Sequence, residues 1–101
     1  MAQLGTTIFT VTEICHHTGV TKDDLNEIIA LGVIEPVEIR TEEWFFDDNA
    51  IVVVHRALKL HRELALDWHG IAIALTLLDE NEQLKQENQQ LKQQLMRFIR
   101  E

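Results

Sequence analysis

The segment TGVTKDDLNEIIALGVIEP (Thr18–Pro36) decides the fold of this chain. Glycines stand near its two ends, at Gly19 and Gly32, where each can end a helix. Between them Thr21 is placed to cap a helix, and Asp24 three residues later repeats the spacing of a capping box. The predicted helix carries an apolar stripe that consists of Leu25, Ile28 and Ile29.

The residues before this segment predict another helix. Thr10 is placed as its N-cap, and Glu13 completes a capping box. Apolar and small residues follow at helical spacing: Val11, Ile14, Cys15 and Thr18. Two helices separated by about three residues around a glycine are typical of a helix-turn-helix, although other helical hairpins share the pattern.

After this segment the period of the apolar residues changes. Val37 and Ile39 alternate with polar neighbours, and Trp44 and Phe46 have the same two-residue spacing. The polar Thr-Glu-Glu between the two pairs predicts a short β-hairpin.

Two further helices are predicted from the hairpin to the end of the chain. Asp47 or Asp48 can cap a third helix that runs to about Ala65, and Asp67 can cap a fourth that no proline interrupts. The apolar face of the third helix is predicted to consist of Ile51, Val54, Leu58 and His61.

The fourth helix contains a heptad pattern from residue 74 to residue 98. The a positions are Ala74, Asn81, Asn88 and Leu95, and the d positions are Leu77, Leu84, Leu91 and Phe98. Asparagine at a fixes register and strand number in coiled coils. We therefore expect a winged-helix domain over residues 1–75 and a coiled-coil helix over residues 76–101, which favours a homodimer. The pattern does not fix whether the two helices run parallel or antiparallel, and a helix packed on its own domain is the alternative. The expected dimerisation residues are Leu77, Leu84, Asn88, Leu91, Leu95 and Phe98.

The charge of the chain is concentrated in one half. The chain has 101 residues, an apolar content of 46% and a formal net charge of −8. Residues 1–50 contain ten acidic and two basic residues, whereas residues 51–101 contain seven of each. This balance disfavours nonspecific binding to nucleic acid or an anionic membrane, and it favours a basic partner.

The order of these elements resembles the winged-helix domain of MerR-type regulators. Four blocks in the same order also resemble the CbpM family of chaperone modulatory proteins, and the resemblance covers about residues 8–100. The blocks are FTVTEICHHTGV, LNEIIALGVIEP, WFFDDNAIVVV and HRELALDWHGIAIALTLLDENEQLKQEN. The resemblance implies a mainly α fold: a MerR-like winged helix-turn-helix with a small β-hairpin wing and a long C-terminal coiled-coil helix.

The resemblance also implies a function. Proteins of the CbpM family bind the J-domain of the DnaJ-like co-chaperone CbpA and inhibit it, by competing with the chaperone DnaK and by reducing the DNA binding of the co-chaperone. The alternatives are a MerR-like transcription regulator and a module that serves only for oligomerisation. A J-domain presents a basic helix, to which an acidic surface could bind.

The surface that such a fold would use to read DNA is acidic in this sequence. With the apolar stripe facing the core, Asp23 and Glu27 face outward, and Lys22 is the only basic residue of the segment 18–36. Phosphate contacts are made mainly by arginine and lysine, so the pattern argues against direct DNA binding. We expect a partner-binding acidic surface that consists of Asp23, Asp24, Glu27, Glu42, Glu43, Asp47 and Asp48. Trp44 and Phe45 are the possible anchors; Trp68 is a further option, although it is expected rather to pack in the core. A merely solvated acidic surface is the alternative.

No other pattern predicts catalysis or a cofactor. The neighbouring residues Cys15, His16 and His17 cannot readily converge on one metal ion from a helix. We therefore predict no catalytic residues, no metal and no cofactor, and we do not expect an enzyme. The basic stripe on the third helix, which consists of Arg56, Lys59 and Arg62, is read as solvated or internally paired. The single cysteine and the absence of a signal peptide or an apolar run of membrane length make the cytoplasm the expected location.

Overall fold

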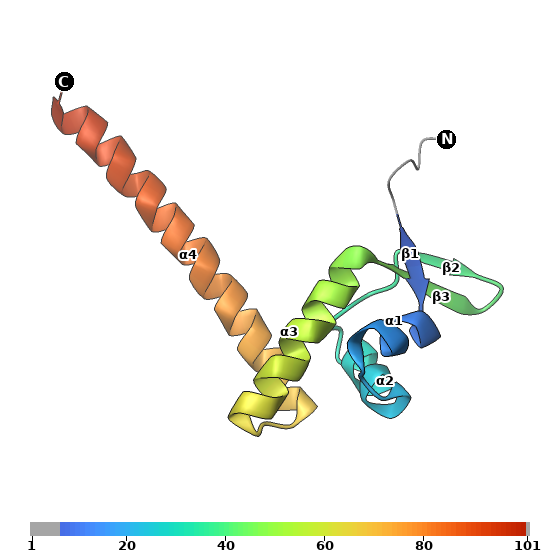
Figure 1. Ribbon diagram of the computed structural model, residues 1–101. Coiled ribbons are helices and arrows are strands. Elements are labelled where there is room, and N and C mark those ends of the chain that lie inside the picture. Colours follow the sequence, from blue (N-terminus) through green and yellow to red (C-terminus); the bar gives the residue numbers. More distant parts are fainter. Residues whose placement is uncertain (1–6, 101) are drawn as a thin grey trace.

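The computed structural model of the protein describes residues 7–100. Within this range the chain forms three strands and four helices (Figure 1). In chain order they are β1 (Ile8–Thr10), α1 (Val11–Thr18), α2 (Lys22–Ala30), β2 (Glu38–Arg40), β3 (Glu43–Asp47), α3 (Asp48–Leu64) and α4 (Trp68–Arg100). The expectation that the chain carries no signal peptide concerns an N-terminal stretch whose first six residues lie outside the described range.

The predicted helix-turn-helix is confirmed by its caps. At the start of α1 the Glu13 amide donates to Thr10 Oγ1 at 3.2 Å, and the Thr10 amide donates to Glu13 Oε1 at 2.8 Å. At α2 the Asp24 amide donates to Thr21 Oγ1 at 3.1 Å, which is the forward half of the predicted box. Gly19 ends α1 with φ +82°, a left-handed conformation that glycine adopts without a Cβ clash.

The sheet contains one strand more than the sequence predicts. The hairpin of β2 and β3 is confirmed, and β1 adds to its other side, which gives the antiparallel order β1-β3-β2. No local pattern in the sequence predicts β1 as a strand. Its pairing places Phe9 opposite Phe46, so the strand before the helix-turn-helix is tied to the strand that leads into α3.

The core lies where one face of the sheet meets the helices. Its fully buried large side chains are Phe46, Ile14, Leu25, Ile28, Ile71 and Val54. Trp68 is also buried and stacks on His61, with 4.2 Å between ring centroids and 10° between planes. On α3 the buried residues are Ala50, Val54 and Ala57, whereas Ile51 and Leu58 are half-buried at its sides. The buried face is therefore centred slightly away from the predicted one.

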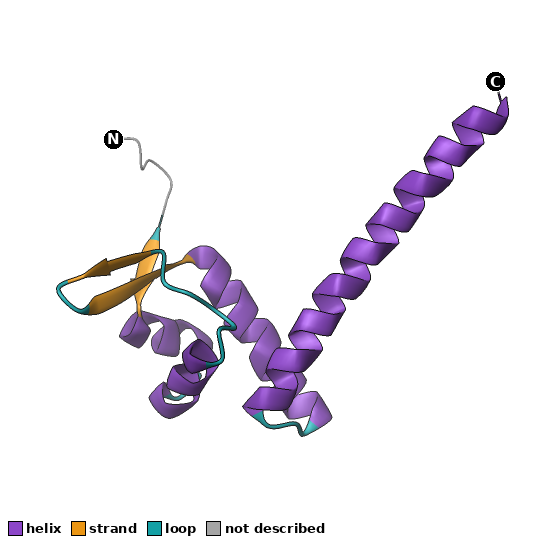
Figure 2. Cartoon of the chain, turned by 180° about the vertical axis from the view of Figure 1, so that it is seen from behind, coloured by secondary structure: helices purple, strands orange, loops and turns teal. Residues whose placement is uncertain are grey.

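The long helix α4 begins in the core and then leaves the domain (Figures 1 and 2). Asp67 caps it as predicted, since Asp67 Oδ1 accepts the Gly70 amide at 2.9 Å. Leu75 is the last buried residue, and every residue from Thr76 to Arg100 is exposed. The radius of gyration is 18.0 Å, against about 13 Å for a compact chain of 100 residues. Within residues 7–100, no helix has the length and apolar character needed to cross a membrane.

Candidate functional site

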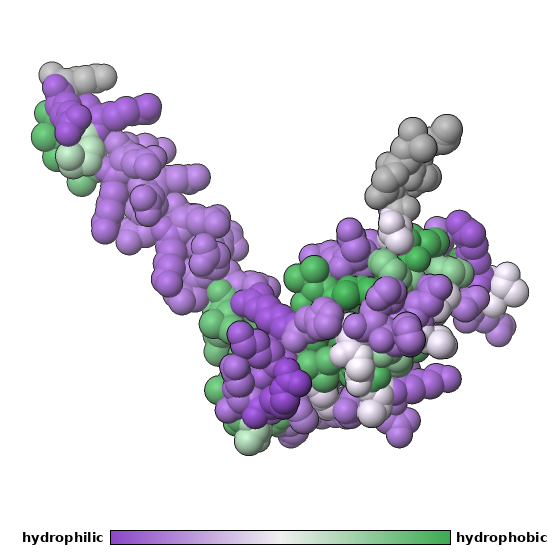
Figure 3. Space-filling view, viewed as in Figure 1, coloured by the Kyte–Doolittle hydropathy of each residue, from purple (hydrophilic) through white to green (hydrophobic). Residues whose placement is uncertain are grey.

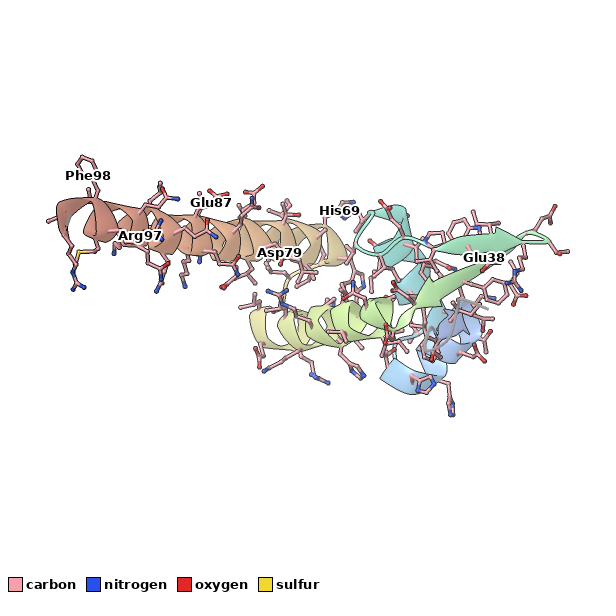
Figure 4. The ribbon with its side chains drawn as sticks, turned by 90° about the horizontal axis from the view of Figure 1, so that it is seen from above. Glu38, His69, Asp79, Glu87, Arg97 and Phe98 are labelled. Atoms are coloured by element: carbon pink, nitrogen blue, oxygen red, sulfur yellow. The ribbon has the colours of Figure 1, made fainter. Side chains whose placement is uncertain are left out.

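The outward face of α2 is acidic in the structure, as the helical spacing predicts. Asp23 and Glu27 are exposed and Asp24 is half-buried, while Leu25 and Ile28 are buried beneath them. His69 lies at the base of α4 (Figure 4). Its Nδ1 is 3.9 Å from Glu27 Oε2, so this carboxylate faces a second helix as well as solvent.

The wing approaches the helix-turn-helix beside a shallow hollow. The hollow has a volume of about 340 Å³. Its walls come from the hairpin, the start of α1 and the first turns of α2: Thr10, Val11, Thr12, Lys22, Asn26, Glu42, Glu43 and Trp44. The structure therefore brings three of the predicted residues, which belong to the wing, next to α2. Lys22 and Asn26 were not among the predicted site residues, because nothing in their local sequence reveals that a hairpin about twenty residues away will face them.

The start of α3 is not part of this hollow. Asp47 lies at the far end of β3 from Glu43, about 13 Å away along an extended strand. Asp47 is also occupied locally, because its Oδ1 accepts the Ala50 amide at 3.3 Å as the N-cap of α3. Asp48 is exposed in the first turn. The seven predicted acidic residues thus occupy at least two separate places on the surface.

The two predicted aromatic anchors lie on opposite faces of the hairpin. Trp44 is 40% exposed and lines the hollow. Phe45 is half-buried on the other face, where the Arg40 guanidinium lies 5.6 Å from the centre of its ring and also pairs with Glu38. Ile39, which is directly opposite Trp44 and 60% exposed, was not among the predicted anchors. Its alternation with Val37 was visible in the sequence, but its exposure depends on where the helices end beneath the sheet.

The predicted dimerisation residues form an exposed stripe on α4. Leu77, Leu84 and Leu91 are between 59% and 63% exposed. Asn88, Leu95 and Phe98 continue the stripe, and Phe98 points away from the helix at its far end (Figure 4). The space-filling view shows apolar surface at the base and the tip of α4 and polar surface between them (Figure 3). Near the base, Arg56 of α3 donates to Asp79 at 3.3 Å, so part of the predicted basic stripe is internally paired.

The remaining candidate groups form no chemical centre. Among residues 7–100, no cluster of three or more histidine, cysteine or acidic side chains could hold a metal ion. Burial raises the pKa of the Cys15 thiol, an effect that nearby Lys22 partly opposes. A raised pKa leaves less of the nucleophilic thiolate at neutral pH. This thiol is therefore suited to packing rather than to catalysis.

Comparison with known proteins gives consistent similarities over nearly the whole chain. The profile of the family described as MerR HTH family regulatory protein matches residues 9–93. The chaperone modulatory protein CbpM of Citrobacter koseri is 61% identical over 95 residues, which cover 94% of each chain. The proteins of the same name from Salmonella paratyphi B and Salmonella newport are each 62% identical over 94 residues, or 93% of each chain. These relatives are named as regulatory or modulatory proteins.

Proposed function

Because the chain belongs to the CbpM family of chaperone modulatory proteins, within the MerR-like fold, we propose that it modulates a chaperone system by binding the J-domain of a DnaJ-like co-chaperone of the CbpA type. Bound there, it covers the surface that the co-chaperone offers to DnaK and so inhibits co-chaperone activity. It also reduces the DNA binding of the co-chaperone. The protein acts by occupying a surface and not by chemistry.

The observation that carries the proposal is the position of the negative charge. Asp23 and Glu27 stand exposed on the helix face that a helix-turn-helix regulator turns to its target. Glu42 and Glu43 stand exposed on the neighbouring wing. Opposite charge across an interface speeds association and fixes orientation, which suits the basic helix of a J-domain.

The same charges oppose the second candidate function, a MerR-like transcription regulator. The profile match to a regulatory family favours this function. However, Lys22 and Arg40 are the only bases among residues 1–50, and phosphates would meet carboxylates at both contact elements. An electrophoretic shift assay tests this second function. If the isolated protein specifically retains genomic DNA fragments at nanomolar concentration, the result favours a transcription regulator over a co-chaperone inhibitor.

Charge reversal on α2 tests the main proposal. The double variant Asp23→Lys, Glu27→Lys should weaken co-chaperone binding about tenfold or more, since two favourable charge contacts become repulsive. Both residues are exposed, so the domain should remain folded. Calorimetric titration with the co-chaperone at low and high salt gives the affinity, and the wild-type affinity should fall as salt rises.

The matched control places the same charge change elsewhere. Glu63→Lys with Glu82→Lys alters the net charge equally, but these exposed residues lie at the end of α3 and on α4. It should bind almost as tightly as the wild type. If the wild type does not bind the co-chaperone at either salt concentration, the proposed function is wrong. If the α2 variant binds normally, the interface lies elsewhere.

We further propose that the protein is a homodimer joined through α4. Leu77, Leu84 and Leu91 repeat every seventh residue and are exposed in the single chain. Burying such side chains stabilises association by about 1.5–3 kcal/mol each. Dimer formation through the projecting part of α4 would leave the wing and α2 free, since these elements belong to the domain from which the helix extends (Figure 1).

A further inference from the structure

We infer that the partner is anchored by a notch on the core-facing side of the wing. The notch is formed by Trp44 and Ile39, next to the hollow beside α2. This inference rests on the proposed function and specifies where the partner is held. Its occupant is a basic amphipathic segment of the partner, which places an apolar side chain against Trp44 and Ile39 and cationic side chains beside Glu42 and Glu43. The acidic residues then frame an apolar contact rather than supply it.

The geometry of the sheet creates this notch. Side chains two residues apart on a strand share one face, so Trp44 lies on the same face of β3 as Phe46. Phe46 is fully buried by the helices, whereas Trp44 is 40% exposed. Ile39 is paired directly with Trp44 and extends the same face to the edge strand β2. The core-facing side of the sheet therefore continues beyond the helices as an uncovered apolar ledge.

The hollow adjoins this ledge at Trp44, which belongs to both. Val11 and Trp44 contribute its apolar wall, and Glu42, Glu43 and Asn26 contribute polar groups. At about 340 Å³ it is large enough to receive a side chain of a partner. An aromatic residue beside an aliphatic neighbour, with charged residues around them, has the composition of an interface hot spot and its rim.

The turn at the tip of the wing has an unfavourable backbone conformation. Thr41 and Glu42 have φ of +49° and +64°, and neither is the glycine that such a turn favours. Left-handed backbone costs roughly 1–2 kcal/mol for an ordinary residue. The turn places Glu42 and Glu43 on the wall of the hollow next to Trp44.

The charges around the notch select the class of occupant. Glu42 and Glu43 of the wing line the hollow together with one base, Lys22. Asp23, the neighbour of Lys22 in the chain, is exposed on α2. The second base of the wing, Arg40, lies opposite Glu43 and is already paired with Glu38. A cationic side chain can contact a carboxylate and also lie over the face of the Trp44 indole. A basic amphipathic segment satisfies both the apolar and the acidic parts. A purely apolar segment satisfies only the apolar part, and an acidic segment is repelled by the carboxylates.

Polar substitution of the ledge tests the inference. Ile39→Ser should weaken binding of the full-length co-chaperone roughly tenfold or more, as expected for an apolar hot-spot residue. Val52→Ser on α3 is the matched control, because Val52 is also β-branched and is 62% exposed, against 60% for Ile39. It should leave the affinity within about twofold. Calorimetry gives both affinities, and thermal unfolding followed by circular dichroism verifies that each variant is folded.

A fluorescence measurement reports on the notch without altering it. The chain has two tryptophans, and Trp68→Phe leaves Trp44 as the only one. Because Trp44 is partly exposed, its emission should shift to shorter wavelength when the co-chaperone covers it. Saturation should follow the calorimetric binding curve.

The outcomes separate this inference from the proposed function. Normal affinity of Ile39→Ser together with an unshifted Trp44 emission in the complex would overturn the notch and leave co-chaperone binding intact. Failure of the wild type to bind would overturn the proposed function and the notch together. Loss of affinity in Ile39→Ser but not in Val52→Ser, with a shifted Trp44 emission, supports both.

Discussion

Ala65 has a left-handed backbone conformation, which is unfavourable for alanine. It follows α3 with φ 54° and ψ 36°, and its amide donates to the His61 carbonyl at 3.2 Å, which closes the helix end. Glycine is the usual residue at such a left-handed helix end, because a Cβ clashes with the neighbouring carbonyl there. The sharp turn from α3 into α4 depends on this position, since α4 begins three residues later.

Ala65→Gly should therefore stabilise the protein. Removal of the clash outweighs the larger entropy of glycine in the unfolded chain, and we expect a gain of about 0.5–1 kcal/mol in the free energy of unfolding. Chemical denaturation followed by circular dichroism measures it. The matched control is Ala30→Gly at the end of α2, also exposed but in helical conformation, which should cost about 0.5–1 kcal/mol. A loss at both positions would contradict the left-handed assignment.

At the scale of single elements, Asp47 connects the sheet to α3 and illustrates how a surface carboxylate can have two roles. It pairs with Ile8 across the sheet and caps the helix through the Ala50 amide. The cap needs a side-chain oxygen, whereas an ionic contact with a partner needs a charge. The two roles can be separated by substitutions that remove one property at a time.

Asp47→Ala should lower the free energy of unfolding by about 1 kcal/mol, because the cap is lost. Asp47→Asn keeps an acceptor oxygen and should cost clearly less. Thermal or denaturant unfolding distinguishes them. The Asn variant then reports on charge alone in a binding titration with the co-chaperone: weaker binding would include Asp47 in the interface. Equal destabilisation by both substitutions would show that the hydrogen bond does not stabilise α3.

The elements that local sequence specifies were predictable, and the ones that depend on distant pairing were not. Thr10, Thr21 and Asp67 cap helices because capping is decided within three residues. β1 has only three residues, and its pairing with β3 joins residues about 37 positions apart, which no local period reveals. In the same way, the alternation of the strand places Trp44 and Phe45 on opposite faces but does not tell which of the two side chains is exposed. Only the register of the hairpin and the extent of the helices beneath it expose one and cover the other.

At the scale of the whole molecule, the compact domain and the projecting helix place different demands on stability. The domain has its own buried core, which ends at Leu75. The last 25 residues of α4 extend about 37 Å beyond it. A helix of this length in water gains little from propensity alone and is normally stabilised by packing of an apolar face. The exposed apolar residues at the base and the tip of α4 are available for that packing (Figure 3).

Substitution of the d positions tests whether a second copy supplies this packing. In sedimentation experiments the wild type, with a chain mass of 11.7 kDa, should behave as a dimer of about twice that mass. Leu84→Asp with Leu91→Asp should yield a monomer, because burying four carboxylates in a two-chain seam costs far more than the lost apolar contacts. The control Gln86→Asp with Gln93→Asp adds the same charge at two outer heptad positions and should remain dimeric. A wild type that sediments as a monomer would refute the dimer and assign the stripe to another partner. If the wild type is a dimer, co-chaperone binding by the monomeric double variant would show that the wing and α2 act independently of the dimer.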